Sequence, residues 1–273
     1  MTTAINHADP AVDDVPLESL TDEELAFLGG PGVHVVTPYF DERGMSAGTP
    51  DLEPLVRTAY RGLLARGIVD PPATDDRPTG PLGDDPAALD LQIRSDVATT
   101  VTLRTASSFV VVARTTERAQ DFWYAHLNHD VVLIEEVSGD GIHRFALSHT
   151  ARLAERLIAA TIHPDAADGE GDSFVLPVEA AADPTPPVEL LERLGAAFVR
   201  ADLVVRAVGD TSPEVLGLYS GPAGCWLVSS GRPGAGRDIV ARPLPAEELR
   251  TIVAQQIAPV VEQHLALACQ VPA

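Results

Sequence analysis

Alternating hydrophobic and polar positions predict a run of β-strands in the middle of the chain, closed by one helix. The predicted strands cover residues 97–103, 109–113, 121–127, 131–137 and 142–147. A two-residue period between turn sequences such as Ser-Gly-Asp-Gly at 138–141 is typical of strands joined by short turns. From residue 150 to 162 the period lengthens to that of an amphipathic helix, with Leu153, Leu157 and Ile158 on one face.

The same order of elements recurs nearer the C-terminus. A helix predicted over residues 188–200 precedes predicted strands at 203–208, 216–219, 225–230 and 238–242. A long helix begins at Ala246 and contains Pro259, which predicts a kink. Two such units predict a two-lobed α+β protein built around sheet surfaces, and the proline-rich stretch near residues 180–187 marks the boundary between the lobes.

Shorter elements are predicted in the N-terminal part. Residues 1–16 are polar and acidic, so we expect them to be disordered, and residues 17–273 then form one two-lobed domain. Thr21 and Glu24 have the spacing of a capping box that opens a short helix. An apolar stripe that begins at Leu52 and ends at Leu63 predicts a second helix.

Composition excludes several classes of function. The formal net charge of −21 in 273 residues repels nucleic-acid phosphates and anionic membranes. All 19 Lys/Arg positions are arginine, which excludes a Walker A loop, a pyridoxal Schiff base and a lysine general base. The N-terminus lacks the parts of a secretory signal, and no run approaches the roughly 20 apolar residues of a membrane span. We therefore expect a cytoplasmic protein.

Four histidines lie close together in the sequence. His126, His129, His143 and His149 fall within 24 residues. They lack the spacing and the cysteine or carboxylate partners of a zinc site, so we expect surface or turn histidines and no metal.

Other candidate groups do not form a recognisable active site. Glu135 and Glu136 are strand neighbours that face opposite ways, so we expect a solvated sheet face and not an acid–base pair. The glycine- and arginine-rich segment 231–237 has the composition of an anion-binding loop but joins two strands, and whether it binds an anion stays open. No nucleophile motif is present, so the sequence predicts no catalytic residue and no cofactor.

Two further segments have more than one interpretation. Residues 57–69, which end in Leu-Leu-Ala-Arg-Gly-Ile-Val, have the pattern of a recognition helix and wing entry in winged-helix domains, which the acidic charge disfavours. Phe122, Trp123 and Tyr124 form an aromatic strand beside the turn at 126–130. Aromatic and histidine side chains are frequent at interaction surfaces. The sequence leaves open whether this strand belongs to the core or to an interface.

The order of these pieces resembles the EspG family, the cytosolic chaperones of type VII (ESX) secretion. Residues 63–69 match the family's L-x-x-R-G-(I/L/V)-V helix end. The strand sequences at 108–114 and 130–134 and the helix at 151–160 occupy the corresponding places. Trp226 and the Gly-Arg pair at 236–237 fill the C-terminal roles, although the family usually has the Gly-Arg pair first.

The resemblance implies a central, mostly antiparallel or mixed sheet with a quasi-twofold repeat, flanked by helices. It also implies a binding protein, not an enzyme, that captures the helical tip of a PE–PPE heterodimer and hands it to the secretion machinery. In the family the sheet surface, the loop between the second and third strands and the C-terminal helices form the site. The partner-binding positions implied here are Trp123, Tyr124, His126, Leu127, Asn128, His129, Asp130 and Ile134.

Two other kinds of function stay open from the sequence. One is an acidic interaction or scaffold protein of another family. The other is a small-ligand binder or enzyme with a pocket between the lobes. The identity of the partner, the secretion system and the oligomeric state, including a homodimer, are open as well.

Overall fold

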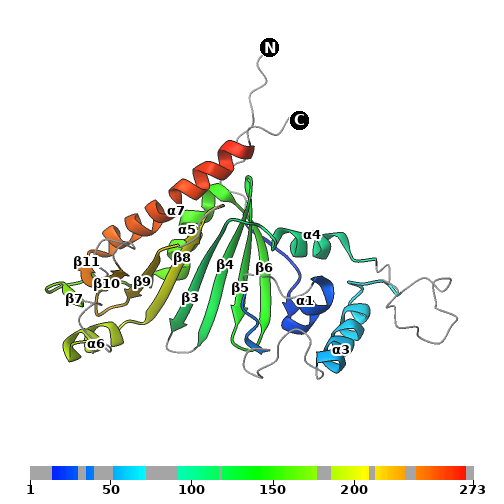
Figure 1. The fold of residues 1–273 in the computed structure, drawn as a ribbon, viewed down its shortest axis with the longest axis horizontal. Coiled ribbons are helices and arrows are strands. Elements are labelled where there is room, and N and C mark those ends of the chain that lie inside the picture. The colour runs from blue at the N-terminus through cyan, green and yellow to red at the C-terminus, as the bar shows by residue number, and fades with distance from the viewer. Residues whose placement is uncertain are drawn as a thin grey trace, which may run out of the picture.

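The protein is described from a computed structural model, which covers residues 14–29, 35–39, 52–71, 92–116, 119–176, 186–208, 213–230 and 238–268. In these residues one 11-stranded sheet has the order β1-β6-β5-β4-β3-β8-β9-β10-β11-β7, with β2 also beside β6 (Figure 1). Neighbouring strands in the described part of this sheet are antiparallel. The predicted α+β class is confirmed, and the sheet is antiparallel where a mixed one was also considered.

The sheet consists of two similar halves. The first contains α4 (Ser95–Leu103), β3 (Phe109–Thr116), β4 (Gln120–Asn128), β5 (Val131–Ser138), β6 (Ile142–His149), the 3₁₀ turn η2 (Thr150–Arg152) and α5 (Leu153–Thr161). The second contains α6 (Val188–Gly195), β8 (Val199–Arg206), β9 (Val215–Ser220), β10 (Cys225–Ser230), β11 (Ile239–Leu244) and α7 (Ala246–Ala268). β3 and β8 join the halves through eight antiparallel residue pairs, which gives the quasi-twofold order of strands.

The N-terminal elements and one short strand complete the fold. They are β1 (Val15–Pro16), β2 (Leu20–Thr21), α1 (Asp22–Gly29) and α3 (Leu52–Ala65), and β7 (Phe174–Leu176) lies at the far edge of the sheet. Figure 1 shows α1, α3 and α4 beside the first half of the sheet, with α7 crossing the other part of the molecule.

Helices cover both faces of the sheet. The largest core cluster joins α5 and α7 to inward residues of both halves, among them Val110, Leu127, Leu203 and Leu227. A second cluster packs α1, α3 and α4 against the opposite face of the first half, around Leu133 and Phe145. On that same side of the second half, α6 places Leu190 near Trp226 and Ala241. Since one core spans β3 and β8, the two halves share buried surface.

Residues 97–103 are helical, so the predicted strand there is wrong. The alternation of β-branched residues in this segment is typical of a strand, yet Val97 and Thr100 are the residues that α4 buries. The hydroxyl groups of Thr99, Thr100 and Thr102 donate hydrogen bonds of 2.8–2.9 Å to the carbonyls four residues earlier. These bonds satisfy the threonine hydroxyls inside the helix, and packing on the sheet outweighs the local propensity.

The capping box predicted at the start of α1 is confirmed. The Thr21 amide donates to Glu24 Oε2 over 3.1 Å, and the Glu24 amide donates to Thr21 Oγ1 over 3.2 Å. Each side chain therefore satisfies an amide that the helix leaves unpaired. Helix α3 ends at Ala65, and Gly67 follows with φ +63, a backbone angle that glycine adopts without strain.

The motif at residues 63–69 closes α3 and does not form a wing. Arg66 donates to Glu24, Glu18 and the Ser19 carbonyl, so it ties the end of α3 to the N-terminal strands. Ile68 and Val69 are buried, and Val69 makes a single bridge with Ile93. α3 packs against α1, where a recognition helix would be exposed.

Several other predictions differ from the structure in detail. The helix predicted at 188–200 ends at Gly195. Val15 and Pro16, in the segment 1–16 that was expected to be disordered, form β1 and pair with β6. The segments 180–185 and 231–237 lie outside the described residues. Among the helices that the structure describes, none has the length and apolar character to cross a membrane.

We predict that the two halves unfold together. The chain has two tryptophans, Trp123 in the first half and Trp226 in the second. The Trp226→Phe variant therefore has a fluorescent reporter only in the first half, and the Trp123→Phe variant has one only in the second. Because the halves share the β3–β8 pairing and one core, fluorescence and far-UV circular dichroism should give the same urea midpoint within each variant. Two separate transitions in either variant would show independent lobes.

Candidate functional site

Five of the eight implied partner-binding residues lie inside the core. Trp123, Leu127 and Ile134 are in the large cluster beneath α5 and α7, with exposed fractions of 3%, 1% and 7%. Tyr124 and His126 face the N-terminal side of the sheet and are 1% and 2% exposed. These side chains offer a partner little or no surface in this conformation, because each strand of the first half is covered on both faces.

The three remaining positions lie at the turn between β4 and β5. Asn128 is partly buried, and its Nδ2 donates to the Leu103 carbonyl over 3.3 Å. His129 and Asp130 are exposed. His129 has φ +56, and the Thr150 hydroxyl and amide fix the turn by donating 2.9 Å bonds to the His129 and Asp130 carbonyls. The turn is therefore a defined surface feature, and its role in binding remains a prediction.

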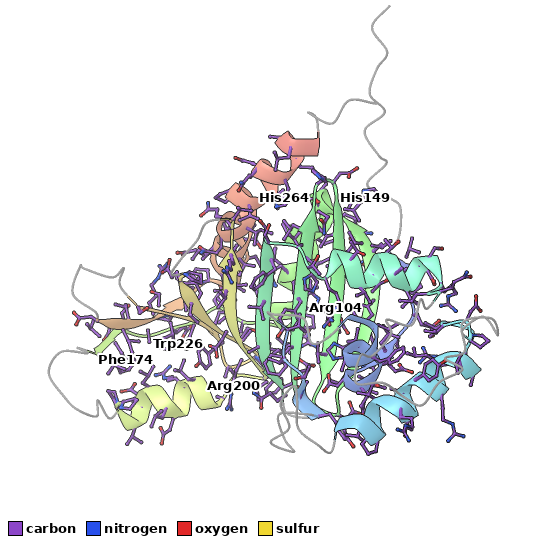
Figure 2. All side chains as sticks on the ribbon, turned by 45° about the vertical axis from the view of Figure 1, so that its right-hand side comes forward. Arg104, His149, Phe174, Arg200, Trp226 and His264 are labelled. Atoms are coloured by element: carbon purple, nitrogen blue, oxygen red, sulfur yellow. The ribbon has the colours of Figure 1, made fainter. Side chains whose placement is uncertain are left out.

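The end of α7 lies at the same end of the sheet as this turn. Figure 2 labels His264 of α7 and His149 at the end of β6 in this region. Leu265 and Leu267, on the last turns of α7, are 36% and 41% exposed. We call the surface made by Asn128, His129, Asp130, His264, Leu265 and Leu267 the apical surface.

His264 is a polar residue in an apolar stripe. It continues the buried row that α7 forms with Leu249, Val253, Ile257 and Val260, and it is 8% exposed. Neither ring nitrogen has a hydrogen-bond partner among the described residues. Burial, and the positive charge that His129 can carry, lower the pKa of His264. An imidazole in this state costs free energy, of the order of 1–3 kcal/mol for a buried polar group without a partner.

A second group of polar side chains is enclosed between the sheet and the N-terminal helices. We call it the buried charge cluster; it consists of Asp22, Arg104, His126, Glu135 and His143. Glu135 is central and fully buried. Arg104 donates to both carboxylate oxygens over 2.9–3.1 Å, and His126 Nε2 lies 2.8 Å from Glu135 Oε2.

His143 bridges two carboxylates inside this cluster. Its Nδ1 lies 2.6 Å from Glu135 Oε1 and its Nε2 lies 2.6 Å from Asp22 Oδ1. An ionised carboxylate only accepts hydrogen bonds, so both ring nitrogens carry a proton and the ring is an imidazolium. The two negative charges of Asp22 and Glu135 are then balanced by the positive charges of His143 and Arg104, and this balance does not depend on His126.

The surroundings shift two pKa values in the directions that this charge assignment requires. Burial alone would raise the pKa of Glu135, but hydrogen bonds from His126 and His143 and the charge of Arg104 hold it well below its usual range. Burial alone would lower the pKa of His143, but its hydrogen bonds to Asp22 and Glu135 outweigh burial and raise it. The ionised forms are therefore the stable ones in the folded protein.

Two tight contacts position Asp22 in the cluster. The Asp22 amide donates to the Gly141 carbonyl over 3.0 Å, and Asp22 Oδ2 accepts from the Tyr39 amide over 2.9 Å. Gly141 has φ +75, and a Cβ there would lie 2.7 Å from Asp22 Oδ2. Glycine is needed at 141 both for the turn and for the close approach of α1.

The buried charge cluster corrects two expectations from the sequence. His126 and His143, expected at the surface, are 2% and 0% exposed, and Glu135, expected on a solvated face, is fully buried. Glu136 is exposed, so the two glutamates do face opposite ways. Because the cluster has no access for a substrate, its arrangement supports a structural role that links α1 and α4 to the sheet.

Two cavities and the metal-binding side chains bear on whether the described residues contain an active site. The larger cavity is an open groove of about 730 Å³ beside β1, β2 and Arg66, and a smaller one of about 290 Å³ lies between β4–β6 and α5. Neither lies between the two halves of the sheet. In the described part of the chain no three His, Cys, Asp or Glu side chains converge to hold a metal ion.

Comparisons with known proteins give a likeness of shape and none of sequence. No protein-family model matches the chain, and a search of curated proteins finds no match. A similar solved structure is that of the Mycobacterium tuberculosis type VII secretion system chaperone EspG5 in complex with a PE25–PPE41 dimer. The TM-score is 0.47 at 11% identity, over 90% of this chain and 95% of that one.

Proposed function

We propose that this chain is a cytosolic chaperone that captures the helical tip of a PE–PPE-type heterodimer for type VII secretion. The sequence resemblance implies a site made by the sheet surface, the loop between the second and third strands and the C-terminal helices, and of these the loop and the helix are accessible. The observation that carries the proposal is that this loop, the β4–β5 turn, and the end of α7 lie at one end of the sheet (Figure 2). A partner can contact the turn and the end of α7 without any unfolding of the core.

The chemistry of the apical surface suits a helical partner. Leu265 and Leu267 offer exposed apolar surface on the last turns of α7, and Asn128, His129 and Asp130 offer polar groups at the turn. Recognition of an amphipathic helix needs this combination of apolar anchors and flanking polar groups. His264 adds a buried ring whose nitrogens have no hydrogen-bond partner among the described residues, and a partner group would relieve that cost.

We predict that Leu267→Glu weakens capture while Leu191→Glu does not. Both leucines are exposed on helices, at 41% and 51%, but Leu191 lies on α6, which Figure 1 shows far from the C-terminal end of α7. If Leu267 is an anchor, a charge there should cost about 2 kcal/mol or more, roughly a 30-fold rise in Kd. The measurement is co-purification with PE–PPE pairs encoded in the same genome, followed by titration of the pair that is retained.

Circular dichroism of both variants provides the control for folding. Equal capture by the two folded variants would contradict the placement of the site on the apical surface. If no PE–PPE pair is retained by the unaltered chain, the chaperone proposal itself fails, and an interaction protein of another family remains.

A further inference from the structure

The edge of the sheet at β6 is covered by the chain's own N-terminal strand. Val15 and Pro16 pair with Leu147 and Ala146 of β6, and the Leu17 amide donates to the Phe145 carbonyl over 2.9 Å. Both residues of β1 are exposed, Val15 to 52%. Since β1 removes little apolar surface from water, hydrophobic burial contributes little to holding it in place.

A carboxylate supplies the specific contact of this strand. Asp14 Oδ1 accepts a hydrogen bond of 2.7 Å from the Ser148 hydroxyl and lies 3.5 Å from Arg152 Nη1. Asp14 Oδ2 forms an ion pair with Arg156 Nη2. Hydrogen bonds between charged partners are about twice as strong as neutral ones, so this acid is the main recognition element of the strand.

The cavity next to Asp14 has binding capacity that the strand does not use. It holds about 290 Å³, its floor includes Trp123 and Ile134, and its charged lining consists of Asp14, Arg114, Glu136, Arg144 and Arg156. Arg114 is engaged by Asp121 through two hydrogen bonds of 2.8 Å. Arg156 Nε is buried and has no hydrogen-bond partner among the described residues.

The local charge differs in sign from that of the whole chain. Without Asp14, the lining of the cavity has three arginines and one glutamate. With Arg152 beside it, this corner gathers four of the 19 basic side chains of a chain whose net charge is −21. Asp121 pairs with Arg114 and Glu155 pairs with Arg152, so with Glu136 the corner keeps a net charge of about +1 without Asp14. An acidic partner is repelled by the surface in general, so a local basic corner decides where it can approach.

We propose that the β6 edge, Ser148, Arg152 and Arg156 bind an extended acidic segment of another protein, and that residues 14–16 fill this site in the free chain. An aspartate or glutamate of the partner takes the place of Asp14. The residues after it pair with Leu147 and Ala146 as an added strand. A neighbouring side chain enters the cavity above Trp123. This site goes beyond the proposed chaperone function, because it contains no residue of the apical surface.

The test uses a fluorescein-labelled peptide with this chain's residues 10–19 as the probe, and the full-length Asp14→Ala variant as the receptor. In the unaltered chain the tethered segment competes at a high effective concentration. We therefore expect the variant to bind the peptide at least about tenfold more tightly than the unaltered chain, by fluorescence anisotropy. A peptide with asparagine at both aspartates should lose most of this affinity.

Two receptor variants separate this site from general charge attraction. Added to Asp14→Ala, Arg156→Gln should weaken peptide binding strongly, whereas Arg200→Gln, an exposed arginine on β8, should not. Equal binding by the unaltered chain and Asp14→Ala, equal binding of both peptides, or equal effects of the two arginine changes would each overturn the proposal.

A dimer of Asp14→Ala in light scattering would also overturn it, because the occupant would then be a second copy of this chain. If Asp14→Ala does not fold, Asp14→Asn, which keeps the shape and removes the charge, carries the same test. No PE–PPE partner is used, so the result is independent of the test of the apical surface.

Discussion

Replacing Glu135 by glutamine should lower the free energy of unfolding by about 3 kcal/mol or more. The change keeps the shape of the side chain but removes the central negative charge of the buried charge cluster. His143 would then keep only Asp22 as a carboxylate partner, and Arg104 would lose the carboxylate that it bonds in the cluster. Removing one partner of a buried ion pair typically costs about 3–5 kcal/mol. Urea denaturation followed by circular dichroism measures the loss.

Glu136→Gln is the matched control for this change. Glu136 is the next residue of β5 and is exposed, so we expect a change within about 0.5 kcal/mol. If the two glutamine variants have the same stability, the buried charge cluster does not contribute in the way described here.

The stability of the folded protein should fall between pH 7 and pH 8.5, and His143→Gln should remove this fall. The pKa of His143 is raised by folding, so its protonated form stabilises the protein fully below the ordinary histidine pKa of about 6.5. That contribution is lost as pH rises through the folded pKa, with a slope of at most about 1.4 kcal/mol per pH unit for one proton.

The lower part of this pH window separates His143 from the other groups that could titrate near it. Burial raises the pKa of Cys225 above its ordinary value of 9.0, so its effect has the same sign as that of His143 but begins only at the upper end of the window. The pKa of His264 is lowered, so its effect has the opposite sign and is complete near the ordinary histidine pKa of about 6.5. The pKa of Glu135 is lowered too, so its contribution is lost only as pH falls through the acid range. Urea midpoints that do not change with pH above 7 in the unaltered chain would contradict the imidazolium assignment.

The strands of both halves could be predicted because each alternates over several residues between clear turns. The segment 225–230 is correct to the residue, and 109–113, 121–127, 131–137 and 142–147 differ only in their ends. The central residues of these strands are buried on both faces of the sheet, and a two-residue period predicts burial on one face only. The strand predicted at 97–103 is wrong because its alternation of threonine and valine lies in a helix. There the threonine hydroxyls donate to carbonyls of the helix itself.

The buried charge cluster could not be predicted from sequence. Glu135 and Glu136 were correctly expected to face opposite ways, but nothing local shows which face is covered by polar partners. Asp22 and His143 are 121 residues apart, and Arg104 reaches Glu135 from a segment expected to be a strand. The glutamate pair in the apolar run of β5 was the available signal, since one of two strand neighbours must point to the covered face and a buried carboxylate needs a positive partner.

The positions that the resemblance implies for partner binding separate into two groups. The turn and the end of the C-terminal helix lie at one end of the sheet, whereas the implied sheet residues are buried. The aromatic residues beside the turn were left between core and interface, and Trp123 and Tyr124 are core. His129 and His264 are far apart in the sequence, so it could not be predicted that His264, at the end of the buried stripe of α7, lies near His129.

The long sequence separation inside the buried charge cluster constrains the order of assembly during synthesis. Asp22 leaves the ribosome early, but the imidazole that it binds belongs to β6, 121 residues later. Contacts so distant along the chain form slowly, because a long loop must close before they are made. Helix α1 can dock only after the β4–β5–β6 meander has been synthesised, so the carboxylate of Asp22 stays solvated until the nascent chain supplies its partner.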